Sequence, residues 1–295
     1  MKKPNAGTAA EVVDRVANAF AENALFYGHG TDNPESEAQW LVSAVLMQQG
    51  AREIKPATAV TALEQEIIEG LQQRRIREKI PLAYLLQEAW FAGHCFYVDE
   101  RVLVPRSPIA ELISDGFQPL LACEPAAILD LCCGSGCIGI ACALAFPDSR
   151  VILSDLSPAA LEVAEINIRR FGLGDRVTTR ESDLFAGIPE SFDLIVSNPP
   201  YVPEAEYREL PAEYHREPEA GLVCEGEGLA IPMEILGQAR LHLEEKGLLI
   251  LETGHTWQAL ARVLPELPFL WLDFEYGGEG VCALTAEQLQ KDNQV

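Results

Sequence analysis

The sequence predicts an α/β protein in which a small helical domain precedes a doubly wound, mostly parallel sheet with an antiparallel edge. Three observations support this prediction. Short apolar runs alternate with helical patterns from about residue 126 onward, as expected for parallel strands joined by helices. Residues 9 to about 88 instead repeat apolar side chains at helical spacing. Two last apolar runs flank a glycine pair, as expected for antiparallel strands.

These patterns divide the 295 residues into three parts. Residues 1–88 form a predicted helical domain, since EVVDRVANAFAENALFYG and TALEQEIIEGLQQRRIREKI each carry an apolar face. Residues 89–108 form a predicted β-hairpin linker, because WFAGHCFYVDERVLVPRSP is rich in aromatic and β-branched residues around Gly93-His94. Residues 109–295 form the predicted sheet domain.

Within the sheet domain the elements follow from apolar runs and from helix start and stop signals. The helix predicted at 157–172 begins at an N-cap candidate, Ser157, with Pro158 in its first turn, and it ends at Gly172. A second helix is predicted at 137–146. Strands are predicted at 126–131, 150–157, 176–183, 192–198 and 246–254, with two more inside 269–284.

Composition excludes several functional classes. Hydrophobic residues make up 48% of the chain, but no apolar run approaches the roughly 18 to 20 residues that a membrane helix needs. The start MKKPNAGTAAEVV has no apolar core of a secretory signal, so we expect a soluble, cytoplasmic protein without a membrane partner. Acidic residues number 45 against 22 basic ones, a formal charge of −23. That charge disfavours duplex nucleic acid and favours a basic partner, or simply maintains solubility.

The eight cysteines do not predict a metal site. Four of them lie in CCGSGCIGIAC, where no CxxC pair and no histidine provide the ligand spacing that zinc requires. We expect them to be buried thiols in a reducing compartment, and we predict no bound metal.

A glycine-rich turn follows the first predicted strand. Gly134, Gly136 and Gly139 form G-x-G-x-x-G, and Asp155 follows Gly134 by 21 residues at the end of the next strand. This is the dinucleotide-binding pattern, in which glycines allow close approach of a ligand and the acid binds a ribose hydroxyl. A nicotinamide-dependent dehydrogenase is therefore one interpretation, and a purely structural turn is another.

The carboxylates at the ends of the first three strands favour a different cofactor. Asp130 precedes the glycine turn, where it would repel a pyrophosphate but attract a cationic amino group. S-adenosylmethionine has such an ammonium group and no phosphate. Asp155 would accept its ribose hydroxyls, and Asp183 would accept the adenine amine. Each aspartate has a structural alternative, because aspartate is common at strand-to-helix turns.

The segment SNPPYV follows the apolar run FDLIV at the end of the fourth predicted strand. Its prolines are common in turns, so an ordinary loop is the simplest interpretation. Chemistry suggests another role. An amide nitrogen is a poor nucleophile, and two acceptors that hold its NH₂ group would orient it toward a methyl donor. The Asn198 side-chain oxygen and the Pro199 carbonyl are such acceptors, and Tyr201 offers a flat face for the amide.

Together, DLCCGSGCIGIA, LSDLS, SDLF and SNPPYV resemble the class I S-adenosylmethionine-dependent methyltransferases of the N-P-P-Y branch, which modify amide or exocyclic amine nitrogens. The chain looks like the protein glutamine methyltransferases of that branch over nearly its full length. FAGHCFYVDERVLVPRSP is similar to their inter-domain hairpin. YGHGTDNP, Ser107-Pro108 and AEYHREPEAGL resemble the bacterial enzymes that methylate ribosomal protein L-three of the large subunit.

The resemblance implies a seven-stranded methyltransferase sheet, a helical domain that recognises a basic ribosomal protein, and S-adenosylmethionine as cofactor. It implies that Asn198, Pro199, Pro200 and Tyr201 hold the glutamine. It also implies a cofactor site formed by Asp130, Cys132, Cys133, Gly134, Ser135, Gly136, Asp155, Asp183, Leu184 and Asn198.

Two departures from the family pattern and several alternatives remain. Cys132-Cys133 stands where the family often has glycine or cysteine and then threonine, and Glu227 replaces a usual aspartate. Methylation of a translation release factor is the nearest alternative. Methylation of DNA adenine is disfavoured, because the chain has no basic face. A dehydrogenase leaves SNPPYV unexplained, and a protein that only binds its ligand would leave the strand-end groups without a purpose.

Overall fold

The computed structural model describes residues 7–51 and 53–290, and its chain forms two compact units. The first unit comprises the residues up to Ala89 together with Pro211–Arg216. The second comprises Trp90–Leu210 and the residues from Glu217 onward. The short segment Pro211–Arg216 thus packs with the helical unit although it lies far along the chain. None of the helices in the described ranges has the length and apolar character needed to cross a membrane.

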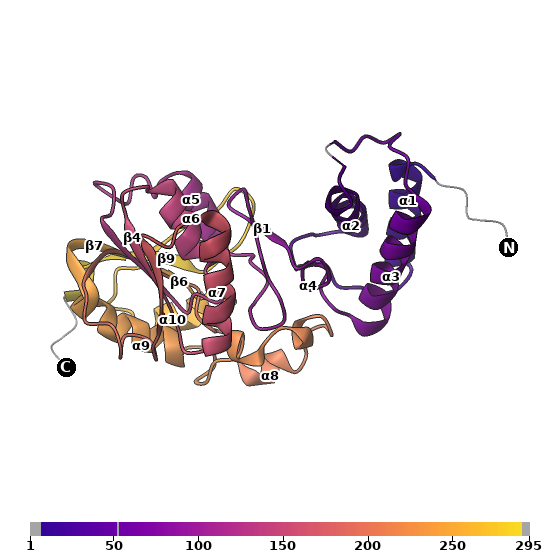
Figure 1. Ribbon diagram of the computed structural model, residues 1–295. Helices are drawn as coiled ribbons and strands as arrows, with labels where there is room; N and C mark the ends of the chain where they lie inside the picture. Colours follow the sequence, from indigo (N-terminus) through magenta and orange to yellow (C-terminus); the bar gives the residue numbers. More distant parts are fainter. Residues whose placement is uncertain (1–6, 52, 291–295) are drawn as a thin grey trace. The chain divides into compact units, whose positions relative to one another are not determined.

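The first unit is helical (Figure 1). Its helices are α1 (Ala9–Ala21), α2 (Pro34–Gln48), α3 (Ala62–Glu78) and α4 (Leu82–Leu86). Thr8 and Thr61 begin α1 and α3 with capping boxes, in which the threonine and a glutamate three residues later satisfy each other's backbone N–H groups. The core contains Val12, Val16 and Phe20, which are at most 1% exposed. The apolar face predicted from the first helical stretch is therefore confirmed.

A buried ion cluster holds Pro211–Arg216 in this unit. Arg75 is 1% exposed, and its guanidinium donates through Nε to Glu37 at 2.5 Å and through Nη1 to Glu213 at 2.9 Å. Its Nη2 donates to the Phe26 carbonyl at 2.8 Å, and the Phe26 N–H donates to Glu213 at 3.0 Å. Burial acts to raise the pKa of Glu213, but hydrogen bonds from Arg75 and the Phe26 N–H prevail and lower it.

The second unit is built on a seven-stranded sheet of order β5-β4-β3-β6-β7-β9-β8. Neighbouring strands from β5 to β7 are parallel, whereas β9 is antiparallel to β7 and to β8. The predicted mostly parallel sheet with an antiparallel edge is confirmed. The strands are β3 (Ala127–Leu131), β4 (Arg150–Asp155), β5 (Val177–Glu181), β6 (Phe192–Ser197), β7 (Leu243–Glu252), β8 (Leu270–Trp271) and β9 (Val281–Thr285).

Helices cover both faces of this sheet (Figure 1). On one face lie α5 (Ile109–Ser114), α6 (Cys137–Ala145) and α7 (Pro158–Phe171), and on the other lie α9 (Ala230–Ala239) and α10 (Trp257–Val263). A four-residue helix, α8 (Glu204–Tyr207), lies in the loop after β6. Short 3₁₀ turns of this unit occur at Glu219–Gly221, Arg240–His242, Gly254–Thr256 and Gln288–Gln290, and another, Tyr214–Arg216, belongs to the helical unit.

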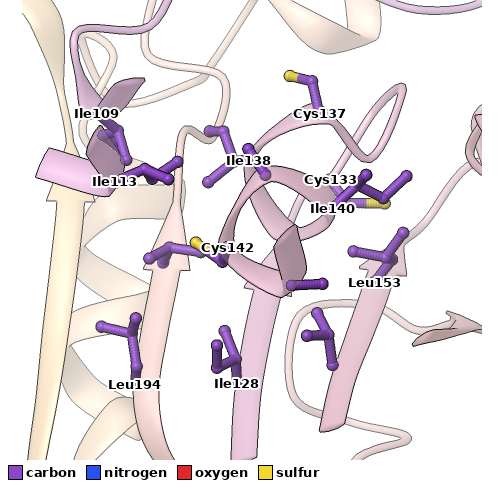
Figure 2. Close-up of a cluster of buried hydrophobic side chains, with 14 of the residues drawn as sticks. Ile109, Ile113, Ile128, Cys133, Cys137, Ile138, Ile140, Cys142, Leu153 and Leu194 are labelled. Atoms are coloured by element: carbon purple, nitrogen blue, oxygen red, sulfur yellow. The ribbon is translucent and has the colours of Figure 1, made fainter. Parts of the chain in front are cut away.

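The two apolar cores follow from the alternation of side chains along each strand. In β3, Ile128 points to the core beneath α5 and α6, whereas Leu129 points to the core beneath α9. Figure 2 shows the first of these cores, where Ile128, Leu153 and Leu194 from three strands lie beneath Ile140 and Cys142 of α6. Cys142 is fully buried and packs there as a small apolar side chain.

Helix α7 ends where the sequence predicts. The Ser157 Oγ accepts a hydrogen bond from the Ala160 N–H, Pro158 occupies the first turn, and Gly172 closes the helix with a left-handed φ of 68°. The predicted hairpin over 89–108 is shorter than expected. Its strands are β1 (Ala89–Phe91) and β2 (His94–Phe96), and the rest of the segment is held by side chains instead. Asn167 of α7 bonds both the N–H and the carbonyl of Tyr97, at 2.7 and 2.9 Å.

Candidate active site

A cavity of about 580 Å³ lies at the carboxyl ends of the parallel strands. Residues that follow β3, β4, β5, β6 and β7 all line it, as do residues of the segment between β2 and α5. This is the edge of an open α/β sheet at which ligands bind. The cavity is formed entirely within the second unit.

Most of the residues predicted for the site meet in this cavity. They lie close together because β3 and β6 are adjacent parallel strands, in which Leu131 pairs with Ser197. The glycine turn and SNPPYV therefore leave the sheet side by side. The predicted residues that line the cavity are Cys132, Cys133, Gly134, Asp155, Asp183, Leu184, Asn198, Pro199, Pro200 and Tyr201. Asp130, Ser135 and Gly136 do not line it.

The glycine turn is tied to the end of β4. The Gly134 N–H donates to Asp155 Oδ2 at 2.9 Å, and the Ser157 N–H donates to Asp155 Oδ1 at 2.9 Å. Burial raises the pKa of Asp155, and these backbone donors counteract part of the rise. Gly134 adopts a left-handed φ of 53°, and a Cβ at this position would meet no atom within 4 Å. The turn therefore leaves an open space beside a carboxylate.

Asp130 lies behind the turn, beneath α6. Its Oδ2 accepts the Gly139 N–H at 2.8 Å, and burial raises its pKa to about 8. Gly139 is required here for packing, since its Cβ would lie 2.3 Å from Leu153 and 2.9 Å from the Asp130 Cβ. The last glycine of the G-x-G-x-x-G pattern thus brings α6 against β3 and β4, and Asp130 supports the turn from behind.

Ser135 and Gly136 are also buried parts of that support. The Ser135 carbonyl accepts from Asn167 Nδ2 at 2.9 Å, so the side chain that holds Tyr97 also holds the glycine turn. A Cβ on Gly136 would lie 2.7 Å from Leu153, which explains the need for glycine at this position.

The loop after β6 is held on both sides. The Ser197 Oγ donates to the Leu131 carbonyl at 2.9 Å, which fixes the loop to β3. Val202 exchanges backbone hydrogen bonds of 2.8 and 2.9 Å with Leu222 and Cys224. Both prolines of the loop are buried. Asn198 is thus presented to the cavity by a backbone with little freedom.

Tyr201 contacts a buried carboxylate that the sequence reasoning missed. Its hydroxyl donates to Glu252 Oε1 at 3.3 Å, and the Ser107 Oγ donates to Glu252 Oε2 at 2.5 Å. Glu252 is 5% exposed, and burial raises its pKa to about 7 although both hydroxyls act to lower it. The only sequence signal was an acid at the end of the apolar run GLLILE, the same signal that drew attention to Asp130.

A second missed pair closes the cavity on the hairpin side. Arg106 donates to both carboxylate oxygens of Glu217, at 2.7 and 2.8 Å, and Glu217 also accepts the Val104 N–H at 2.9 Å. Glu217 is 4% exposed. This bidentate pair anchors the chain just before Pro218 and Gly221, which line the cavity. No sequence pattern linked positions more than one hundred residues apart.

Three features define the protein as a Rossmann-like methyltransferase. They are a parallel sheet with one reversed strand near its edge, a glycine turn beside a strand-end aspartate, and an Asn-Pro-Pro-Tyr loop in the same cavity. Comparisons with known proteins agree. The family model "Methyltransferase small domain" matches residues 115–216. The chain is 42% identical to a ribosomal protein uL3 glutamine methyltransferase of Francisella tularensis, over 91% of this chain and 87% of that one. It is 43% identical to the protein of the same name from Neisseria gonorrhoeae, over 96% and 95%.

The chain therefore belongs to the ribosomal protein uL3 glutamine methyltransferase family. Among solved structures, a methyltransferase from Pyrococcus furiosus is similar with a TM-score of 0.48 and 16% identity, over 77% of this chain and 99% of that chain. This likeness is too distant to add to the sequence comparison. The chain is a methyltransferase, and its cofactor is S-adenosylmethionine.

The cavity has the chemistry that this cofactor requires. Carboxylates at Asp155 and Asp183 match hydroxyl and amine donors, and the exposed Leu156 between β4 and α7 offers an apolar surface for a flat ring. The Ser154 hydroxyl, which also lines the cavity, is buried and has no hydrogen-bond partner among the described residues. A bound ligand with polar groups would satisfy it. The residues present thus fit S-adenosylmethionine.

Proposed function

We propose that this enzyme methylates the side-chain amide nitrogen of one glutamine in ribosomal protein uL3. One observation carries the proposal: the Asn-Pro-Pro-Tyr loop lines the same cavity as the glycine turn and Asp155. An acceptor for an amide and a site for the methyl donor thus share one wall. The names of the two relatives supply the substrate.

The cofactor is assigned to the side of the cavity formed by the ends of β3, β4 and β5. Asp155 accepts hydroxyl hydrogens there, and Gly134 allows close approach of the ligand. Asp183 is exposed at the end of the next strand and accepts from an amine. Cys132, Cys133 and Leu184 complete this wall. When bound, S-adenosylmethionine supplies an electrophilic methyl group.

The loop after β6 orients the nucleophile. The Asn198 side-chain oxygen and the Pro199 carbonyl accept the two amide hydrogens of the glutamine, so that its nitrogen lone pair faces the methyl donor. The same oxygens stabilise the positive charge that develops on this nitrogen during transfer. Asn198 is partly exposed and lines the cavity, so its side chain is open to a substrate. Tyr201 presents its ring to the flat amide. The extra proton leaves the nitrogen after transfer.

The partner is a basic protein met in the cytoplasm. With a formal charge of −23, the enzyme attracts a cationic ribosomal protein and repels nucleic acid. The helical unit, including Pro211–Arg216, is assigned to recognition of this protein, and residues 109–295 outside that segment are assigned to chemistry.

Methyl transfer to purified proteins tests the proposal. Unmethylated uL3 and an unmethylated translation release factor, each produced in cells lacking this enzyme, are incubated separately with the full chain and methyl-labelled S-adenosylmethionine. We expect label in uL3 alone, with mass spectrometry locating one added methyl on one glutamine side chain. Label in the release factor alone would transfer the assignment to that substrate. Label in neither protein would overturn the glutamine assignment.

A further inference from the structure

Glu252 is an ionisable residue in an unfavourable position. It is the last residue of β7, 5% exposed, and it lines the cavity. Burying a carboxylate without a directly contacting cation is costly, and apolar replacements of similar shape are often as stable. The hydrogen bonds to Glu252 come from two hydroxyl groups. The positive charge of Arg106 lowers the pKa of Glu252 less than these hydrogen bonds do. Stability therefore gives no reason for an acid at this position.

The contacts of Glu252 explain its presence better. One oxygen accepts the hydroxyl of Tyr201 and the other accepts the hydroxyl of Ser107. The Ser107 Oγ in turn accepts the Ile109 N–H at 3.2 Å, at the start of α5. The carboxylate thus connects the Asn-Pro-Pro-Tyr loop to β7 and to the segment before α5. All three of these side chains line the cavity.

The Tyr201 ring is also limited from another direction. Gly254 lies so close that a Cβ there would be 2.5 Å from ring atom Cε2 and 3.0 Å from the hydroxyl. Backbone on one side and a hydrogen-bonded carboxylate at the hydroxyl end leave the ring few orientations. A rigid ring is what a flat amide requires of a stacking surface.

We propose that Glu252 is a positioning residue, which fixes the Tyr201 ring in the cavity wall through the tyrosine hydroxyl and is itself held by Ser107. The inference rests on the proposed function, since it takes Tyr201 as the surface for the substrate amide. Glu252 itself does not touch the reacting atoms. Its effect on the rate is transmitted by Tyr201.

A double-mutant cycle in the full-length enzyme tests the proposal. The value of kcat is calculated per enzyme molecule that binds S-adenosylhomocysteine, so that misfolded protein does not count. We expect Glu252→Leu and Tyr201→Phe each to lower kcat about tenfold, the worth of roughly one hydrogen bond. The double variant should be no slower than the slower single variant, because both changes remove the same restraint. Glu252→Gln retains an acceptor for Tyr201 and a polar partner for Ser107, so its kcat should stay within about threefold of wild type. Additive losses in the double variant would overturn the proposal.

A second double-mutant cycle combines Ser107→Ala with Tyr201→Phe, so it does not require Glu252→Leu to fold. Ser107→Ala should lower kcat several-fold in the wild-type background and have no effect in the Tyr201→Phe background. Ser149→Ala is the matched control, because this serine is 1% exposed and its hydroxyl bonds the Pro125 carbonyl away from the cavity. Both alanine variants should lower the unfolding temperature, but only Ser107→Ala should change kcat. An equal kcat for these two variants would contradict the proposal.

The outcome also separates this inference from the proposed function. If Asn198→Ala abolishes transfer while the Glu252 and Ser107 variants retain wild-type kcat, only the positioning role is wrong. If Asn198→Ala retains transfer, the proposed function itself fails. Binding of S-adenosylhomocysteine, measured by calorimetry, should change less than about twofold in the Glu252, Ser107 and Tyr201 variants, because none of these three residues belongs to the cofactor wall.

Discussion

Replacing Gly254 by alanine displaces the tyrosine ring of the Asn-Pro-Pro-Tyr loop. A Cβ at this position would lie 2.5 Å from Tyr201 Cε2 and 2.7 Å from Cζ, whereas carbon atoms in contact are normally about 3.5 to 4 Å apart. The ring must therefore move by about 1 Å. A displacement of that size in a positioning group costs about 100-fold in rate. We expect Gly254→Ala to lower kcat by about this factor, with cofactor affinity nearly unchanged.

The backbone strain of this substitution needs a matched control. Gly254 has a φ of 48°, and an alanine in this left-handed region costs about 1 kcal/mol of stability. Gly172, at the end of α7, has a φ of 68° and no atom within 4 Å of its Cβ position. Gly172→Ala thus imposes the same strain without moving a side chain. We expect it to lower stability by about 1 kcal/mol and to leave kcat unchanged.

Two measurements decide this prediction. Thermal unfolding reports the stability of each variant, and initial rates of methyl transfer at saturating cofactor report kcat. If Gly254→Ala and Gly172→Ala show the same kcat, the position of the Tyr201 ring does not matter to the reaction. Tyr201 would then not be the surface that holds the substrate amide.

Three further predictions concern charged groups. Glu252 binds its proton more tightly in the folded state, since its pKa is raised from 4.5 to about 7, so its contribution to stability falls as pH rises between these values. As pH rises across that range, Glu252→Gln should therefore gain stability relative to wild type, by at most about 3 kcal/mol. Urea titrations at several pH values measure this, and a difference in unfolding free energy that does not change with pH would contradict the raised pKa. Arg75→Met leaves two buried carboxylates unpaired and should cost about 3 to 5 kcal/mol. Arg74→Met, at a 53% exposed side chain of the same helix, should cost less than about 0.5 kcal/mol, and equal losses would refute the role of the cluster. Asp155→Asn should weaken S-adenosylhomocysteine binding about tenfold in calorimetry, and unchanged affinity would remove Asp155 from the cofactor site.

The sequence was sufficient for the parts of the fold that depend on local patterns. Alternating apolar runs indicated the parallel strands, and Ser157, Pro158 and Gly172 marked the ends of α7. Strand ends also predicted most of the cavity wall, because parallel strands bring their carboxyl ends to one edge. Cys132, Asp155 and Asn198 therefore lie where their motifs suggested.

Other parts depend on contacts between distant positions, which no local pattern reveals. Asp130 was predicted to act on the cofactor through water or through the glycine turn, but the sequence did not reveal that it lies under α6 and accepts the N–H of Gly139. The partnership of Ser107 with Glu252 spans 145 residues. The burial of Arg75 depends on Glu213, which lies 138 residues away. Glu213 belongs to the helical unit, although the chain before Pro211 and after Arg216 belongs to the sheet unit. Such pairs require the folded backbone to be known.

In the proposed reaction, the Asn198 side chain holds the amide that receives the methyl group. The direct measurement is methyl transfer to unmethylated uL3 by Asn198→Ala, followed by mass spectrometry of the modified peptide, with S-adenosylhomocysteine affinity measured on the same sample. We expect cofactor affinity within about threefold of wild type and a rate reduced at least 100-fold, as for loss of a group that stabilises charge in the transition state. Transfer by Asn198→Ala at a rate near that of wild type would contradict this role of Asn198.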